Sequence, residues 1–251
     1  YWLSIADSNI LFWARAIAHE RGLNVDVSEA DASPLAVQGP LAEEVVASLF
    51  GDWVRELRFF WFKETEINGI PVAVARSGWS KQGGFEIYLM DGRKGAALWN
   101  IVEEAGRPFD IGPGNPNNVE RIESGLLSWG GDTDDSTNPF EVRMGSFVDL
   151  DVPDDVVGIK ALRRIKEEGP KRQQLGIILY SPSPMQQPFH WFTITRDGEH
   201  VGHQTNLTWS FRMEKNIGFA LVSSDCSIGD RVEVSDQYGT TSGVLTSLPF
   251  L

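Results

Sequence analysis

The segment from Ser77 to Leu89 restricts the fold more than any other part of the chain, because a glycine-rich turn leads into a strand with two different faces. By the two-residue period of a strand, the apolar residues take one face and the polar ones the other: Phe85, Ile87 and Leu89 against Glu86 and Tyr88. The apolar face predicts burial. The polar face, with Trp79 in the turn, suits a flat, polar or cationic ligand, although an ordinary half-exposed strand shows the same alternation.

The bulk composition predicts a water-soluble globular protein. The chain has 251 residues, 41% of them hydrophobic and 23% charged, which is enough for one large or two modest domains. No apolar run approaches the roughly 20 residues of a membrane span, and no signal-peptide pattern opens the chain. The net charge of −13 opposes a phosphate backbone, so we expect neither membrane nor nucleic-acid binding.

The cysteine and histidine content argues against thiol and metal chemistry. Cys226 is the single cysteine, which excludes an intrachain disulfide and favours a reducing, cytoplasmic compartment. We expect a structural role for it. The four histidines show no metal-ligand spacing, so no metal site is predicted.

The first half of the chain alternates strand and helix patterns. We predict strands at 1–6, 23–27, 35–40, 59–65 and 70–75, with Asn68-Gly69 as a hairpin turn. Helices are predicted from Ile10 to Gly22, from Pro40 at the first helical position, and over 95–105. These runs indicate an α+β body built from ferredoxin-like units.

The pattern of predicted helices and strands changes after Asn138-Pro139. One helix is predicted over 158–168, and its basic residues read as a solvated face. Short strands separated by Gly and Pro follow at 177–180, 191–194, 201–203, 218–222 and 232–234. This spacing indicates a small antiparallel barrel with Greek-key connections.

A second unusual segment, Arg-Ile-Glu-Ser-Gly-Leu-Leu at 121–127, continues with Asp132 and Asn138-Pro139-Phe140-Glu141. Together with the 77–89 segment, it resembles the folate-dependent aminomethyltransferase family, the T-protein of the glycine cleavage system and its relatives. Trp79 stands where that family has tyrosine, and Ser80-Lys81-Gln82 replaces its Thr-Gly-Glu. Within the family, these residues and Ile111-Gly112-Pro113-Gly114 are most similar to the dimethylsulfoniopropionate demethylase branch.

The resemblance covers nearly the whole chain and implies an organisation. It implies a folate-binding domain at 1–145 that lacks its N-terminal part, a connecting segment with a helix at 146–172, and a C-terminal β-barrel domain at 173–251. About one hundred residues would precede Tyr1, in keeping with common domain sizes. We therefore expect the chain to be a fragment that lacks part of its ligand cavity.

The resemblance implies tetrahydrofolate as methyl acceptor. By motif position Glu86 binds the pterin ring, where a carboxylate accepting parallel N–H bonds orients its partner. Trp79, Tyr88 and Phe60 are further candidates around the folate. Arg121 either pairs with the folate tail carboxylates or is a buried structural partner of Glu123.

The second implied substrate is a small sulfonium zwitterion, which aromatic faces stabilise by about 0.5–2 kcal/mol each. Trp53 and Trp79 are the candidates for it, with Ser4 as a donor to the substrate carboxylate. We expect Trp53 to lie on a turn without a core role, and the aromatic run 59–62 to alternate between two strand faces. Core packing remains the alternative for each aromatic.

No catalytic residue is assigned, because in-line attack by folate N5 on a sulfonium methyl needs chiefly alignment and desolvation. The products would be 5-methyltetrahydrofolate and methylthiopropionate. The alternatives are an aminomethyltransferase, another folate-dependent demethylase, the folate-binding half of a betaine-type oxidase, and a non-catalytic folate-binding regulator. Ile5, where T-proteins have asparagine, argues against an aminomethyl substrate. A homodimer is possible.

Overall fold

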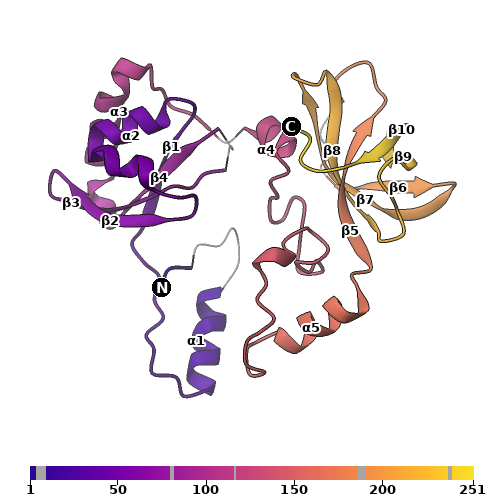
Figure 1. Cartoon of the computed structure of the whole chain (residues 1–251), viewed down its shortest axis with the longest axis horizontal. Helices are drawn as coiled ribbons and strands as arrows, with labels where there is room; N and C mark the ends of the chain where they lie inside the picture. The colour runs from indigo at the N-terminus through magenta and orange to yellow at the C-terminus, as the bar shows by residue number, and fades with distance from the viewer. Residues whose placement is uncertain (4–9, 80–81, 116, 186–189, 237–238) are drawn as a thin grey trace. The chain divides into compact units, whose positions relative to one another are not determined.

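The computed structural model describes residues 1–3, 10–79, 82–115, 117–185, 190–236 and 239–251. The chain divides into two compact units, Ser8–Asn117 and Asn118–Leu251, with Tyr1–Asp7 assigned to the second. Figure 1 shows the helices and strands of each unit, and each unit has its own hydrophobic core. The three segments expected at 1–145, 146–172 and 173–251 stay a prediction.

The first unit begins with helix α1 (Ile10–Glu20), which confirms the helical spacing read from the sequence. None of its residues is buried. The strand predicted at 23–27 is wrong: the segment is irregular, Leu23 and Val25 are exposed, and the carbonyl of Val27 accepts a bond from Arg15 Nε at 2.7 Å. Tyr1–Leu3 also lie outside any strand, and the rest of the strand predicted at 1–6 falls outside the described residues.

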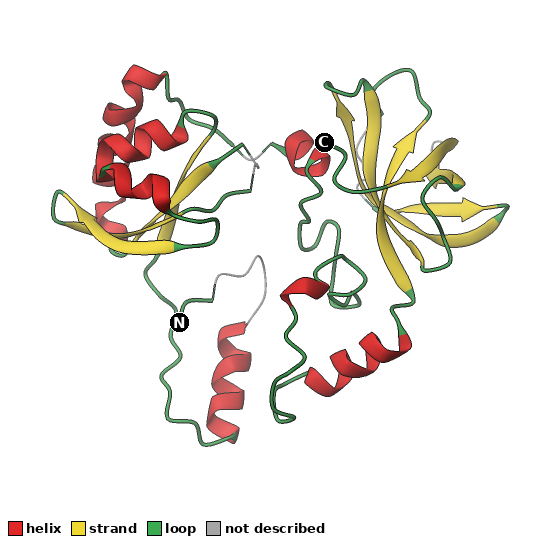
Figure 2. Cartoon of the chain, in the orientation of Figure 1, coloured by secondary structure: helices red, strands yellow, loops and turns green. Residues whose placement is uncertain are grey.

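A four-stranded antiparallel sheet forms the body of this unit (Figure 2). Its order is β1-β4-β3-β2, and the strands are β1 (Ser33–Gln38), β2 (Phe62–Ile67), β3 (Ile70–Ala75) and β4 (Gly84–Leu89). Helix α2 (Ala42–Phe50) and the short helix η1 (Asp52–Glu56) connect β1 to β2, which lie at opposite edges. Helix α3 (Gly95–Gly106) follows β4 after the turn η2 (Gly92–Lys94) and leads into η3 (Arg107–Phe109).

The side chains of β4 alternate between buried and half-buried positions, as predicted. Phe85, Ile87 and Leu89 are at most 3% exposed and pack in one cluster with residues of α2 and α3, whereas Glu86 and Tyr88 are half-buried on the other face. Helix α2 buries Ala42, Val45 and Val46 as expected from its spacing. It begins at Ala42, so Pro40 precedes the helix instead of occupying its first position.

The hairpin between β2 and β3 confirms the Asn68-Gly69 turn, because Ile67 pairs with Ile70 and both turn residues have positive φ. Strand β2 starts at Phe62 and not at Phe59. Phe59 and Phe60 form a turn, in which Phe60 has a φ of 66°. The expected alternation of 59–62 between two faces is therefore wrong, and all four aromatic side chains are exposed.

The second unit starts with the short helix α4 (Asn118–Glu123), which the sequence analysis missed. A long irregular segment with the turn η4 (Gly145–Phe147) leads to helix α5 (Ile159–Glu168), at the predicted place. The remaining chain folds into a closed barrel in the order β10-β5-β8-β7-β6-β9. Its strands are β5 (Arg172–Leu179), β6 (Phe192–Arg196), β7 (Glu199–Ser210), β8 (Lys215–Ser223), β9 (Arg231–Asp236) and β10 (Gly239–Thr246).

All neighbouring strands of the barrel are antiparallel. Strands β6, β7 and β8 follow one another as a meander, and β5 lies beside β8, which is the predicted Greek-key connection. The barrel interior is closed by aliphatic side chains, and Cys226 is buried among them. Burial raises the pKa of the Cys226 thiol, which fits a structural role. Within the described ranges, each helix is too short or too polar to cross a lipid bilayer.

Candidate functional site

A pocket of about 540 Å³ lies in the first unit, beside the polar face of β4. Its wall contains Glu86, Trp79 and Gly78, residues 35–38 of β1, three residues of α3, and the loop 111–115. A volume of this size is typical of small-molecule sites, and apolar walls with few polar groups are their usual lining. The structure thus brings two of the predicted site residues, Glu86 and Trp79, into one cavity.

Two side chains bond the same oxygen of the Glu86 carboxylate. Ser77 Oγ and, at 3.3 Å, Tyr88 Oη both donate to its Oε2 atom. Within the described part of the chain, these bonds leave Oε1 for a ligand. Ala36 of β1 and Ala75 of β3 are the cross-strand neighbours of Glu86, and Ala36 also lines the pocket. Tyr88 is not among the lining residues of the pocket, and its bond to Glu86 links it to the pocket.

The turn that carries Trp79 is fixed by Gln38. Its Nε2 atom donates to the carbonyls of Ser77 at 3.2 Å and Phe85 at 3.1 Å, one on each side of the turn. A Cβ atom added at Gly78 would lie 2.1 Å from Gln38 Oε1, and one at Gly84 would lie 2.6 Å from the carbonyl oxygen of Val37. Glycine is thus required at position 84 by the close approach of the β1 backbone, whereas the atoms nearest Gly78 belong to the flexible side chain of Gln38. Trp79 is 39% exposed, as expected for an indole that faces a cavity.

Trp53 and Phe60 lie outside the wall of this pocket, in the segment 52–61 of the same unit. Trp53 is on η1, packs partly against the core, and contacts Phe50 with a ring distance of 6.5 Å. The expectation that it has no core role is therefore wrong. Lys63 Nζ lies 4.5 Å from the centre of its ring. Phe60 is 67% exposed. The role of Trp53 toward the sulfonium substrate and that of Phe60 toward folate stay predictions.

Arg121 is buried in the second unit and is 2% exposed. Its carboxylate partner is Asp132, at 2.6 Å, and not Glu123. Its guanidinium also donates to the carbonyl of Leu126 and to Asn118 Oδ1. Glu123 is instead bonded to Ser210 and Arg212. Arg121 is thus buried and has a different carboxylate partner from the one expected, and a contact with the folate tail stays a prediction.

Several residues of the pocket were not predicted. Trp99, Val102 and Glu103 come from α3, and Gln38 from the end of β1. Trp99 directly follows the buried Leu98 and is 45% exposed. It therefore lies off the core face of its helix, which is an unusual place for a large aromatic residue. Ser4, Ser80 and Lys81 lie outside the described residues.

A second hollow of about 580 Å³ lies on the barrel. It is lined by residues of β6, β9, β10 and the 197–198 turn, among them Asp197, Arg231 and Glu233. None of the predicted site residues belongs to it. The described residues also contain no group of three or more His, Cys, Asp or Glu side chains placed to hold a metal ion.

An antiparallel sheet with a carboxylate pocket, followed in the chain by a closed six-stranded barrel, defines a two-part α/β and β-barrel protein. Two family profiles match this organisation: the GCVT N-terminal domain over residues 1–152, and the glycine cleavage T-protein C-terminal barrel domain over residues 172–251. The chain belongs to the glycine cleavage T-protein (aminomethyltransferase) family.

The relatives to which this chain is similar include proteins named for two different activities. The dimethylsulfoniopropionate demethylase DmdA of Ruegeria pomeroyi is 40% identical over 240 residues, which cover 95% of this chain and 65% of the relative. An aminomethyltransferase of Caldanaerobacter subterraneus is 33% identical over 204 residues, covering 80% of this chain and 53% of the relative.

Among solved structures, the glycine cleavage system aminomethyltransferase T from Bartonella henselae has the same fold, with a TM-score of 0.73 at 22% identity. The match covers 96% of this chain and 66% of that one. The chain therefore spans about half to two thirds of the length of these relatives.

Proposed function

We propose that this chain belongs to a tetrahydrofolate-dependent demethylase that transfers a methyl group from dimethylsulfoniopropionate to folate N5. The observation that carries the proposal is the pocket whose wall contains both Trp79 and Glu86, a carboxylate whose two protein donors both bond Oε2. The 40% identity to a dimethylsulfoniopropionate demethylase along 95% of the chain supports the choice of substrate. Relatives named aminomethyltransferases are 33–36% identical, so that activity is the second candidate.

The residues present fit tetrahydrofolate. The pterin edge carries several N–H donors, and Glu86 supplies an acceptor whose second oxygen is already fixed by Ser77 and Tyr88. Trp79 and Trp99 add flat apolar surface to the same cavity. Tetrahydrofolate serves here as a co-substrate that accepts the methyl group.

In the proposed reaction the methyl carbon forms a bond to N5 while its bond to sulfur breaks. The electron pair of that bond stays on sulfur, which leaves as the neutral thioether methylthiopropionate, and N5 loses one proton. The protein has to align the two reactants and exclude water, for which no nucleophilic side chain is needed. An indole such as Trp79 stabilises the compact sulfonium cation before transfer.

The test is an assay of the full-length protein with tetrahydrofolate and dimethylsulfoniopropionate. We expect 5-methyltetrahydrofolate and methylthiopropionate in equal amounts, detected by mass spectrometry, and none when either reactant is omitted. Folate binding without transfer would favour a regulator. Methylene transfer from an aminomethylated lipoyl carrier would favour an aminomethyltransferase. Sedimentation of the same sample tests whether the protein is a homodimer.

A further inference from the structure

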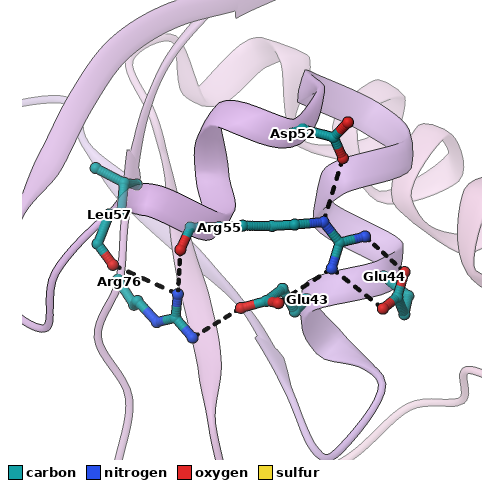
Figure 3. A network of polar contacts seen from close by, with 6 residues as sticks. All are labelled: Glu43, Glu44, Asp52, Arg55, Leu57 and Arg76. Carbon is teal, nitrogen blue, oxygen red and sulfur yellow. Dashed lines mark hydrogen bonds and ion pairs between the residues drawn. The ribbon is translucent and has the colours of Figure 1, made fainter.

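A network of charged side chains fixes the segment that carries Trp53 and Phe60 (Figure 3). Arg55 Nη1 bonds Glu43 Oε1 at 3.0 Å, and its Nη2 bonds Glu44 Oε2 at 2.7 Å. Arg76 Nη2 bonds the other oxygen of Glu43 at 2.8 Å, so this one carboxylate of α2 joins two arginines. Asp52 completes the network through Arg55 Nε at 3.2 Å.

Arg76 is the member of this network that reaches the backbone of the segment. Its Nη1 donates to the carbonyls of Arg55 at 3.3 Å and Leu57 at 3.4 Å, as Figure 3 shows. The main chain of Arg76 bonds the C-terminal end of the segment. Its carbonyl accepts from the amide of Phe60 and its amide donates to the carbonyl of Trp61, both at 2.9 Å. Arg76, which directly follows β3, therefore bonds the segment 55–61 at four points, two through its side chain and two through its main chain.

The segment needs such support. Phe60 has a φ of 66°, a left-handed conformation that is unfavourable for a residue with a bulky side chain and persists only where the surroundings impose it. The side chains of Glu43, Arg55 and Arg76 are about one third exposed, and ion pairs at that exposure contribute little to overall stability. The network is thus better suited to fixing a conformation than to stabilising the fold.

Arg76 also adjoins the residues that hold Glu86. Its neighbour Ser77 donates to Glu86, and its guanidinium carbon lies 5.3 Å from the centre of the Phe85 ring. Arg76 therefore lies between Ser77, which bonds the predicted folate carboxylate, and the segment that carries Trp53, the aromatic residue predicted for the sulfonium substrate. We propose, on the basis of the proposed function, that Arg76 is a positioning residue, which sets the affinity for the sulfonium substrate by fixing segment 52–61 without contacting the substrate itself.

The test compares R76Q and R76K with the control R93Q in the full-length protein. Arg93 pairs with Asp91 in the same unit and is 88% exposed, so its loss reports only the loss of one surface ion pair. We expect R76Q to raise the KM for dimethylsulfoniopropionate about tenfold, since small misplacements of binding groups have effects of up to about a hundredfold. The Kd for tetrahydrofolate should change less than this KM, because R76Q keeps the main-chain bond to Phe60 and leaves Glu86 bonded to Ser77 and Tyr88. R76K has a single nitrogen in place of the two that bond Glu43 and the carbonyls of Arg55 and Leu57, so it should restore only part of the affinity.

An unchanged KM in R76Q, an equal rise in the Kd for tetrahydrofolate, or full rescue by R76K would overturn the proposal. A readout that needs no substrate separates it from the proposed function: 19F NMR of protein labelled with 5-fluorotryptophan, with signals assigned through W53F and W61F. We expect the signals of Trp53 and Trp61 to shift in R76Q and not in R93Q. Failure of methyl transfer in the wild type would refute the proposed function, and unshifted signals would refute the role of Arg76.

Discussion

At the scale of single residues, Glu86 is the side chain on which the proposed chemistry most depends. Two protein donors occupy Oε2, so a ligand that donates to Oε1 completes the carboxylate. The two oxygens of the Glu86 carboxylate therefore have different surroundings. A change at Glu86 also alters the ligand contact and the bonds to Ser77 and Tyr88 together.

We predict that E86Q in the full-length protein weakens tetrahydrofolate binding. The amide presents an N–H where the pterin edge also donates, and loss of a charged acceptor costs about 1.5–3 kcal/mol, or about ten- to a hundredfold in Kd. Isothermal titration calorimetry measures the effect. E66Q is the matched control, because Glu66 lies exposed on β2 of the same sheet. Equal affinities of E86Q and wild type would remove Glu86 from the site.

His203 is a second residue with a testable consequence. Burial lowers the pKa of His203, and the nearby charges of His200 and Arg172 lower it further, while a bond to the backbone of Phe192 opposes them. The ring of His200 lies 4.9 Å from that of His203. The folded state therefore disfavours the protonated form more than the unfolded state does.

The sign of the pH dependence follows from this lowered pKa. We predict that the free energy of unfolding is greatest above the unfolded value of about 6.5 and falls as the pH drops toward the folded pKa, since the unfolded state binds more protons there. Urea unfolding between pH 7.5 and 5.5 measures the slope, above the range where most carboxylates titrate. H203Q should flatten it, whereas H19Q, at an exposed position of α1, should not. A stability that rises on acidification would contradict the prediction.

At the scale of elements, the pairing of β1 with β4 shapes the pocket. Gln38 pairs with Gly84 in register, and Gly84 has a φ of +148°. The side chain of Gln38 fills the space that Cβ atoms at Gly78 and Gly84 would need. The two strands can therefore approach this closely only where position 84 is glycine, because a Cβ there would meet the backbone of β1.

We predict that G84A destabilises the protein by about 1–3 kcal/mol, because a Cβ there meets backbone 2.6 Å away and the conformation is strained. G95A is the control. Its Cβ would meet no atom within 4 Å, and alanine is favoured by about 0.5–1 kcal/mol over glycine in a helix. Chemical denaturation compares the two variants. Equal stability of G84A and wild type would show that β1 shifts at little cost.

At the scale of the whole molecule, the hydrophobic residues form separate clusters in the two units. Ile87 in the sheet and Ile177 in the barrel are each fully buried. We predict that I87A and I177A each cost about 2–5 kcal/mol, and that the loss is local to the unit that contains the substitution. Hydrogen exchange read by mass spectrometry should show faster exchange in β1–β4 for I87A and in β5–β10 for I177A. Equal acceleration in both regions for either variant would contradict separate cores.

The sequence by itself determined the elements whose signals are local. The alternation in 85–89, the helices α1, α3 and α5, and the Asn68-Gly69 hairpin all follow from the period of the side chains or from turn chemistry within a few residues. Gly78, Trp79 and Glu86, which the sequence singled out, also lie in the wall of one pocket. The order of an α/β body before a barrel could be read from the same patterns.

The tertiary structure decided which residues meet, because contacts across the chain depend on which elements pair. The 23–27 segment alternates like a strand, yet it pairs with no strand in the described part of the chain. Strand β10 lacks an alternating pattern, yet its backbone pairs with β5 and β9 through groups that every residue carries. Likewise Asp132 and not Glu123 reaches Arg121, and Gln38 meets the Gly-Trp turn only because β1 pairs with β4. A local pattern specifies the conformation of a segment, whereas the partner of a side chain is specified only when distant segments pack together.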